Sequence, residues 1–291
     1  MMKTDKPSFM IVDGMALLFR AFYATAMSGQ FMVNSKGLPT NGVQGLLKHL
    51  LLAADQFQPD HLVVCWDMGS KTFRTEMFKD YKANRSKPPV EMIPQFDLAK
   101  EAVAAFDIPN LGIAGFEADD CIGTLARSQS QDFQISILTG DQDFLQLIDP
   151  DISVILLKKG YGNYEVHNEE TFFEWKGITP RQMIDLKGMM GDSADNYPGV
   201  KGIGEKTAIK LLQQYQSVEG ILENLDQLTK AQRTKFENSL EMLHMSRELA
   251  TIKCDIPLQC PLDDSIFMFD HNKVADMVRE HELKTLYRRF S

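Results

Sequence analysis

Several features that mark whole classes of protein are absent from this sequence. The 291-residue chain has only four cysteines, which form no CxxC pair and have no histidine at zinc-ligand spacing. The cysteine pattern therefore indicates neither a zinc site nor a disulfide framework. No apolar run approaches the roughly 18 residues that a membrane-spanning helix needs, and Asp13 interrupts the apolar stretch 9–19. We expect a soluble, cytoplasmic protein with reduced thiols and no membrane partner.

The chain also lacks a positive net charge. Forty acidic residues against 31 basic ones give a net charge of −9. Taken alone, this value argues against a nucleic-acid partner, because phosphates repel an acidic protein. Hydrophobic residues make up 44% and charged residues 24% of the chain, an ordinary globular balance that excludes disorder.

Short apolar runs alternate with longer amphipathic stretches through the first half of the chain. Strands separated by helices of such lengths form parallel βαβ units, so we predict an α/β core with a parallel sheet over residues 1–180. Strand signals then vanish, which predicts a mostly helical region over residues 181–291. The expected strands are 9–12, 61–66, 134–138 and 153–157; the expected helices are 43–57, 92–106, 119–128, 179–190, 206–215, 230–252 and 272–290.

Acidic residues gather where an open parallel sheet binds its ligands. Positions that follow the strands converge on one crevice at the carboxyl ends of the sheet. Each acid on its own could be a helix cap or a turn residue. Nine like charges in one crevice need neutralising, however, and carboxylate oxygens suit hard divalent cations. We predict metal binding by Asp13, Asp67, Glu117, Asp119, Asp120, Asp141, Asp143, Asp192 and Asp195.

This assignment changes the meaning of the net charge. Without the nine acids, the chain has 31 acidic and 31 basic residues. The whole negative net charge then belongs to the predicted site, where divalent ions would cancel much of it. An acidic chain is therefore compatible with a polyanionic substrate.

Two segments combine basic residues with features that suit phosphates. Residues 71–87 hold six bases and interleaved aromatic side chains, a mixture typical of single-strand binding; a solvated amphipathic helix is the alternative. The glycine-rich turn 199–204 precedes a helix and offers backbone N–H groups to phosphates, although it also fits an ordinary turn. It is no Walker A loop, because Glu205 separates the last glycine from Lys206.

Taken in order, these motifs resemble the 5′→3′ exonuclease and flap endonuclease family. The similarity is greatest to the 5′-nuclease domain at the N-terminus of bacterial DNA polymerase I, in a stand-alone form. The matching stretches are collinear and run from residue 9 to about 215. They are 11–14 (IVDG), 20–23 (RAFY), 72–74 (TFR), 81–85 (YKANR), 117–120 (EADD), 140–143 (GDQD), 185–192 (DLKGMMGD), 195–196 (DN) and 199–207 (GVKGIGEKT).

The resemblance implies a PIN-like α/β nuclease core and assigns roles by position. It places a helical arch at about 70–90 and a helix–hairpin–helix element at about 185–215. Asp67, Glu117, Asp119 and Asp120, with Asp13 nearby, would form one metal group; Asp141, Asp143, Asp192 and Asp195 would form the second. Lys82 and Arg85 would contact the scissile phosphate as catalytic residues. Contacts to DNA are expected from Arg20, Arg74, Lys79, Tyr81, Lys187, Lys201, Gly202, Gly204, Lys206 and Thr207.

The resemblance also implies cofactors and partners. Two Mg²⁺ ions per active site are expected, with Mn²⁺ as an alternative ion, and the hairpin would hold a monovalent cation such as K⁺. The expected partner is DNA with a 5′ flap, a 5′ overhang or a nick. The chain ends near the point where a polymerase I would continue, so we expect any coupling to a DNA polymerase to occur in trans.

Two other functions remain open from the residues alone. A PIN-type ribonuclease would use the same carboxylate crevice, although small RNA-cleaving domains need neither the hairpin nor the long basic segment. A DNA-junction binding protein would hold structural metal without turnover. A DxDxT phosphatase is disfavoured, because Phe144 and Leu145 follow Asp143.

Overall fold

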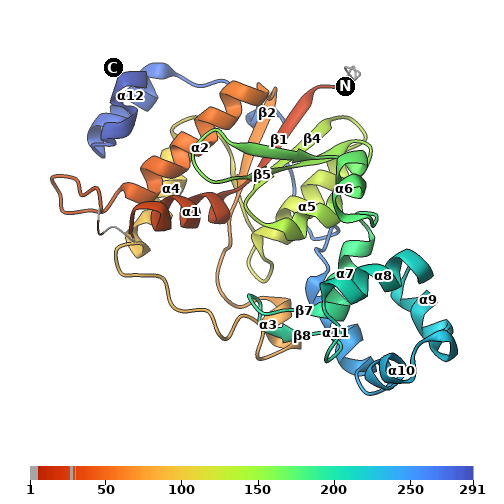
Figure 1. Cartoon of the computed structure of the whole chain (residues 1–291). Coiled ribbons are helices and arrows are strands. Elements are labelled where there is room, and N and C mark those ends of the chain that lie inside the picture. The colour runs from red at the N-terminus through yellow and green to blue at the C-terminus, as the bar shows by residue number, and fades with distance from the viewer. Residues whose placement is uncertain (1–5, 27–28, 30, 291) are drawn as a thin grey trace.

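A six-stranded sheet forms the centre of the molecule in the computed structural model, which describes residues 6–26, 29 and 31–290 (Figure 1). The strand order is β3-β2-β1-β4-β5-β6; the first five strands are parallel, and β6 runs antiparallel to β5. All four predicted strands are present. The strands are β1 Ser8–Asp13, β2 His61–Cys65, β3 Asn110–Leu111, β4 Gln134–Thr139, β5 Ile152–Leu157 and β6 Tyr164–His167.

Alternating side chains of the strands divide the core between the two faces of the sheet. In β1, Phe9 and Ile11 join one hydrophobic cluster, whereas Met10 and Val12 join the other, as the two-residue period of a strand requires. One cluster includes side chains of α1, α2 and α4, and the other includes those of α5. These helices are α1 Gly14–Ala26, α2 Asn41–Phe57, α4 Ile93–Ala104 and α5 Ala118–Gln129; α6, Glu169–Lys176, follows β6.

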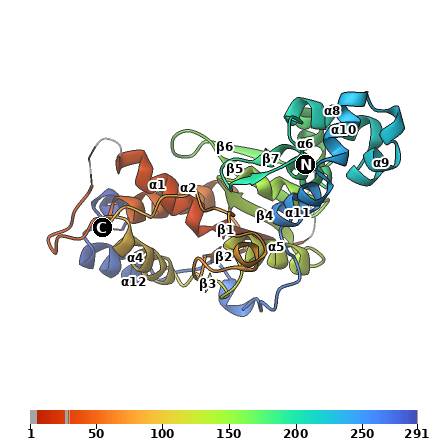
Figure 2. The same ribbon diagram turned by 90° about the horizontal axis from the view of Figure 1, so that it is seen from below.

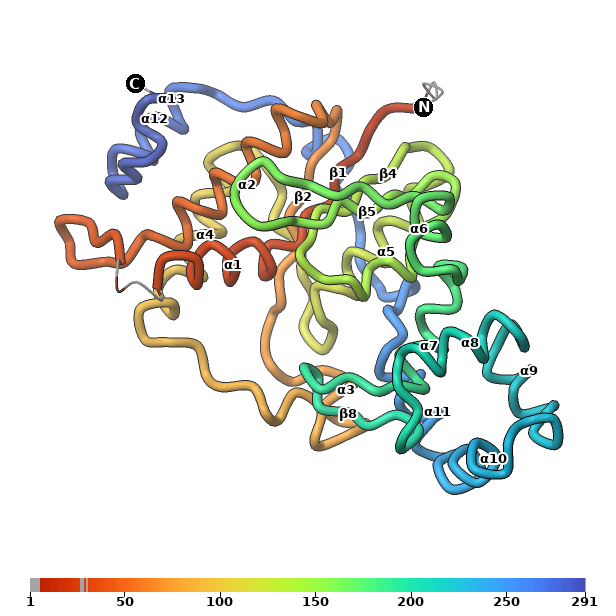
Figure 3. The backbone as a smooth tube through the Cα atoms, viewed as in Figure 1, coloured from red at the N-terminus to blue at the C-terminus, as the bar shows by residue number. Residues whose placement is uncertain are grey.

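The basic segment 70–90, here called the arch segment, leaves the core after β2 and returns to it at α4. It carries one short helix, α3 (Phe73–Met77), followed by turns rather than a long helix. Figure 3 shows this segment reaching the small hairpin of β7 (Gly191–Asp192) and β8 (Tyr197–Pro198). Lysine and arginine side chains of the arch segment are thereby brought to the second half of the chain.

The second half is mostly helical, as predicted, and two of the expected helices contain breaks that the pattern did not reveal. The expected helix 230–252 is interrupted by a turn at Asn238 and Ser239, two residue types that favour turns and caps over helix interiors. The expected helix 272–290 is interrupted near Glu282, which has a φ of +53°. The helices are α7 Gln182–Met190, α8 Glu205–Tyr215, α9 Val218–Glu223, α10 Lys230–Glu237, α11 Leu240–Ala250, α12 His271–Glu280 and α13 Tyr287–Phe290.

The last two helices pack against the core. Phe290 of α13 lies against Phe106, with ring centroids 5.7 Å apart, and Figure 2 shows α12 at the opposite end of the molecule from α8, α9 and α10. The division of the chain at residues 180 and 181 stays a prediction. Among the described residues, no helix combines the length and the apolar character needed to cross a membrane.

Candidate active site

The parallel strands β1, β2 and β4 deliver acidic residues to the same edge of the sheet. Asp13 is the last residue of β1, Asp67 lies two residues beyond β2, and Asp141 lies two residues beyond β4. Gly14 allows this approach, because a Cβ atom there would lie 2.7 Å from Val64 Cγ1. The carboxyl ends of neighbouring parallel strands therefore converge, as the sequence predicts.

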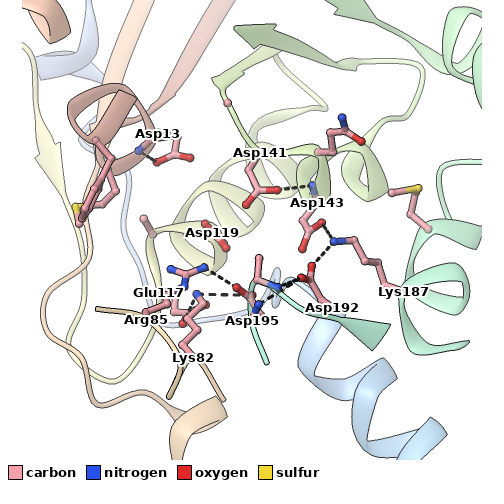
Figure 4. A pocket seen from close by; sticks show the side chains of 18 of the residues that line it. Asp13, Lys82, Arg85, Glu117, Asp119, Asp141, Asp143, Lys187, Asp192 and Asp195 are labelled. Atoms are coloured by element: carbon pink, nitrogen blue, oxygen red, sulfur yellow. Dashed lines mark hydrogen bonds and ion pairs between the residues drawn. The ribbon is translucent and has the colours of Figure 1, made fainter. Parts of the chain in front are cut away.

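Eight of the nine predicted metal-binding acids line one cavity of about 730 Å³. Figure 4 labels all of them except Asp67, together with Lys82, Arg85 and Lys187, and shows the labelled side chains gathered around one space. The acids come from the ends of β1, β2 and β4, from the start of α5, and from the β7–β8 hairpin. They are Asp13, Asp67, Glu117, Asp119, Asp141, Asp143, Asp192 and Asp195.

Asp120 is the exception, and its predicted role as a metal ligand is not supported by its position. Its side chain is fully buried outside the cavity lining. Oδ1 accepts hydrogen bonds from Arg74 and from the Lys253 amide, and Oδ2 accepts from Arg74 and from the Glu117 amide. Four donors occupy the lone pairs of this carboxylate, which leaves none for a cation.

The arch segment closes one side of the cavity through ion pairs with the acids. Lys82 Nζ lies 2.8 Å from Glu117 Oε1 and 4.0 Å from Asp195 Oδ2, and Arg85 lies 2.5 Å from Asp195 Oδ1. Lys82 has a φ of +56°, a left-handed conformation that costs lysine about 1–2 kcal/mol. Its amide donates to the Asp195 carbonyl oxygen at 2.8 Å. The turn is thus held against the β7–β8 hairpin.

Lys187 links two of the remaining acids on the other side of the cavity. Its ammonium lies 2.6 Å from Asp143 Oδ1 and 2.5 Å from Asp192 Oδ2. Burial would lower the pKa of Lys187, but these two carboxylates outweigh burial and raise it. Lys187 therefore stays charged and holds Asp143 next to Asp192.

Burial and mutual repulsion disfavour the charged form of several carboxyls in the cavity. Burial is the main cause that raises the pKa of Asp13 to about 6 and that of Asp143 to about 7, and Asp141 adds to both through its charge. Burial also raises the pKa of Asp119 well above its ordinary value, with further contributions from Glu117 and Asp13. A cation in the cavity would favour the ionised forms of these groups.

The donor chemistry of the cavity fits hard divalent cations. Its acidic lining offers only carboxylate oxygens, and Asp119 is the one carboxylate of the eight without a hydrogen bond or ion pair to any described residue. Elsewhere in the cavity, Lys82 and Arg85 pair with Glu117 and Asp195. Lys187 pairs with Asp143 and Asp192. In the arrangement seen, no three His, Cys, Asp or Glu side chains within residues 6–26, 29 and 31–290 form a complete metal site.

Two residues predicted to contact DNA pair with the acids of the site. The Arg74 side chain is 2% exposed and pairs with Asp120 and Glu117, so a role as a direct DNA ligand is wrong for this conformation. The Tyr81 hydroxyl lies 3.2 Å from Glu117 Oε2 and 3.1 Å from Asp195 Oδ2. Arg74 compensates the buried Asp120 carboxylate, whereas Tyr81 adds hydrogen bonds to carboxylates that Lys82 and Arg85 also pair with. Tyr81 also lines a second pocket along the arch segment, so a DNA contact by its side chain stays a prediction.

The other predicted DNA contacts lie on accessible surfaces. Arg20 lines the cavity, and its guanidinium donates to the Lys158 carbonyl oxygen. Lys79 is exposed on the arch segment. The glycine-rich turn lies between α7 and α8, with Val200 and Ile203 buried beneath it. Of the predicted contacts there, Lys201, Gly202, Gly204 and Lys206 are exposed and Thr207 is half-buried.

Sequence reasoning missed residues that join distant parts of the site. Lys176 and Glu205 form an ion pair at the edge of the cavity, 2.8 Å apart. Lys235 donates to the Gly202 carbonyl oxygen at 2.8 Å. Each partner comes from a different helix or turn, so no local motif signals these contacts.

Family models and relatives agree with this architecture. The N-terminal resolvase-like domain of 5′-3′ exonucleases matches residues 8–176, and their C-terminal SAM fold matches residues 178–273. A 5′-3′ exonuclease of Bacillus subtilis (strain 168) is 57% identical over 279 residues, which cover 96% of this chain and 94% of that protein. DNA polymerase I of Bacillus caldotenax is 39% identical over 279 residues, or 94% of this chain; the match spans only 31% of the polymerase.

Solved structures support the same fold. T5 5′-exonuclease with bound zinc has a TM-score of 0.67 at 20% identity, covering 97% of this chain and 96% of its own. The catalytic core of Rad2 in complex with DNA substrate has a TM-score of 0.60 at 17% identity, covering 98% and 92%. The extent of the family matches and the identity to the Bacillus subtilis exonuclease establish that this chain belongs to the 5′→3′ exonuclease family.

Proposed function

We propose that this chain hydrolyses DNA phosphodiester bonds near 5′ ends, both as a 5′→3′ exonuclease and as a structure-specific flap endonuclease. One observation carries the proposal: eight carboxylates and the cationic side chains of Lys82, Arg85 and Lys187 line a single cavity beside the arch segment. Such a cavity suits a phosphate held between divalent cations and positive side chains.

Two Mg²⁺ ions, with Mn²⁺ as an alternative, are the cofactors that suit this donor set. Glu117, Asp119 and Asp67, with Asp13 nearby, would hold the first ion. Asp141, Asp143, Asp192 and Asp195 would hold the second. When bound, such a pair of ions acidifies water and stabilises charge on the attacking and leaving oxygens of a phosphodiester.

The side chains of the arch segment are suited to a phosphate. Lys82 and Arg85 now pair with Glu117 and Asp195, and both line the cavity. Burial would lower the pKa of Lys82, but Glu117 and Asp119 outweigh burial and raise it, so its positive charge persists. These two residues would stabilise charge that develops on the scissile phosphate, a role commonly worth about 3 kcal/mol per donor.

The surroundings of the cavity suit a junction between single-stranded and duplex DNA. A second pocket of about 460 Å³ lies along the arch segment and shares Asp67, Lys82 and Arg85 with the first. This pocket would receive the displaced 5′ strand. The turn 199–204 and Lys206 would bind the backbone of the adjoining duplex, where K⁺ is the cation that the family resemblance suggests.

Replication and repair, including primer removal, follow as the expected setting. The match to polymerase I covers about a third of that enzyme, so cooperation with a DNA polymerase in trans is part of the proposal. Action on DNA also implies a cytoplasmic location.

Cleavage of a 5′-labelled flap duplex tests the proposed function. The wild-type chain should release short 5′ products with Mg²⁺ and none with EDTA. Asp119→Asn is the sharpest variant, because the Asp119 carboxylate has no hydrogen-bond partner among the described residues. It should lose cleavage by at least about a hundredfold, like the loss of other central charge-stabilising groups, and still bind the flap in EDTA.

Wild-type protein that binds the flap but never cuts with Mg²⁺ or Mn²⁺ would favour the non-catalytic junction-binding alternative. Faster cleavage of a matched RNA flap would favour the ribonuclease.

A further inference from the structure

A short stretch of backbone runs behind both groups of acids. Residues 249–253, here called the strap, comprise the last two residues of α11 and the three that follow it, and they lie against α5. A Cβ atom on Gly123 of α5 would lie 2.6 Å from Ile252 and 3.1 Å from the Lys253 carbonyl oxygen. This contact is closer than any side chain allows, so α5 and the strap are packed directly against each other.

The first group of acids is joined to the strap by Arg74. Its guanidinium donates to the Leu249 carbonyl oxygen at 3.0 Å and to the Thr251 carbonyl oxygen at 2.6 Å. The same guanidinium binds Asp120 and lies 3.3 Å from Glu117 Oε2. Asp120 in turn accepts from the Lys253 amide at 2.9 Å. The start of α5, which carries Glu117 and Asp119, is therefore fixed to the strap.

The second group of acids is joined to the same strap by Gln146. Its amide nitrogen donates to the Asp143 carbonyl oxygen at 2.9 Å and to the Ala250 carbonyl oxygen at 3.0 Å. Its amide oxygen accepts from the Ile252 amide at 2.9 Å. The side chain is buried, so these three bonds have no water to replace them.

The helix before the strap connects it to the rest of the helical region. Arg247 of α11 pairs with Asp185 of α7 at 2.8 Å, and the Ser246 hydroxyl donates to the Pro198 carbonyl oxygen next to the glycine-rich turn. Leu249 and Ala250 pack with Tyr81 and Tyr197. One continuous segment thus touches both acid groups, the arch segment and the base of the hairpin.

We infer that the strap sets the spacing between the two groups of acids, and that Gln146 is a positioning residue which holds Asp143 at the distance needed for metal binding. The inference deepens the proposed function and rests on it. Gln146 touches neither metal nor substrate; it acts through the backbone of Asp143. Side chains that orient metal ligands in this indirect way commonly change metal affinity by about 10–100-fold when removed.

Gln182 supplies a matched control for Gln146. It is also a buried glutamine. It donates to the Leu212 and Gln216 carbonyl oxygens and accepts from the Thr179 amide. Both residues therefore make three bonds to backbone groups, and only Gln146 makes one to a residue of the acid groups.

The test is a Mn²⁺ titration of the EDTA-treated full chain, with free Mn²⁺ followed by electron paramagnetic resonance. Gln146→Met should weaken Mn²⁺ binding by about tenfold or more, whereas Gln182→Met should keep the wild-type affinity. Both variants should lower the melting temperature in EDTA by similar amounts, because both lose three buried hydrogen bonds. Flap affinity in EDTA should stay within about twofold of wild type for both.

Wild-type Mn²⁺ affinity in Gln146→Met would overturn the inference, and so would an equal loss of affinity in both variants. If Gln146→Met does not fold, Gln146→Asn with Gln182→Asn gives the same comparison, because the shorter amide does not span the three groups. Failure of the proposed function is distinguishable: the wild-type chain itself would then bind no Mn²⁺ or not cut the flap.

Discussion

Replacing Arg74 by methionine distinguishes a DNA-contacting arginine from a structural one. The motif around Arg74 resembles a DNA contact, yet the side chain is 2% exposed and bound to the fully buried Asp120. Removing one partner of such a buried pair costs about 3–5 kcal/mol, because the other charge is left uncompensated. With an unfolding entropy of about 2.1 cal/mol/K per residue, the melting temperature of a 291-residue chain shifts by about 1.6 °C per kcal/mol, so Arg74→Met should lower it by about 5–8 °C.

Thermal melts in EDTA, combined with flap binding in EDTA, measure this effect. Arg289→Met is the matched control, because Arg289 makes a bidentate pair with Asp55 at 2.6 and 2.7 Å on the exposed surface. Exposed pairs contribute about 0–1 kcal/mol, so this variant should melt within about 2 °C of wild type. Adding Asp120→Asn to Arg74→Met should recover part of the loss, since the buried charge is then removed.

The opposite pattern would refute the buried-pair reasoning. If Arg74→Met melts within about 2 °C of wild type but binds the flap tenfold more weakly, Arg74 is a DNA ligand. The same conclusion would follow if the Asp120→Asn addition recovered nothing.

Three further outcomes are expected. The Asp13 and Asp143 pKa values of about 6 and about 7 lie above the ordinary value of 3.8, so the folded protein holds protons that the unfolded chain releases. These two groups should therefore lower the stability of the metal-free protein as pH rises from about 4 to about 7. In EDTA, the melting temperature of Asp143→Asn should depend less steeply on pH than that of the wild type, and an unchanged slope would contradict the pKa shift. Because a metal must displace these protons, Mn²⁺ affinity should fall as pH drops from 7.5 to 5.5, and a pH-independent affinity would argue against binding by these carboxyls. The double variant Lys201→Met/Lys206→Met changes one lysine of the turn 199–204 and one of α8. In flap-binding titrations it should reduce the slope of log affinity against log salt by about 2. An unchanged slope would show that neither lysine contacts the DNA backbone.

The convergence of the acids could be predicted from the sequence because it depends on topology. Apolar runs mark the strands, and parallel strands bring the residues that follow them to one edge. Asp13, Asp67 and Asp141 meet for this reason. The β7–β8 hairpin joins them through long-range packing; Asp192 and Asp195 were predicted from their spacing after a helix, and no strand pattern places them at this edge.

The different positions of Asp119 and Asp120 show where the pattern was insufficient. Both stand in the first turn of α5, and either residue suits a helix start. Successive residues of a helix point about 100° apart, so only one of the two can face the cavity with Glu117. Cys121, Ile122 and Leu125 mark the buried side of α5, but its orientation relative to the sheet was needed to choose between the acids.

Arg74 and Gln146 illustrate contacts that no local pattern predicts. Arg74 lies among the bases of the arch segment and looks like one of them. Its partners lie 43 to 177 positions away in the chain, and two of them are backbone carbonyls. Gln146 likewise binds Ala250 and Ile252 through backbone atoms. Backbone groups carry no sequence signature, so a side chain that binds them is recognised only once the fold is known.

The placement of charges also explains how a chain with a net charge of −9 can belong to a family that acts on DNA. Eight acids line one cavity, and the three cations nearest to them neutralise only part of this charge. Divalent ions would neutralise most of the remainder and leave Lys82 and Arg85 free to turn from Glu117 and Asp195 toward a phosphate. The local charge at the cavity, rather than the net charge of the chain, therefore decides whether a polyanion can approach.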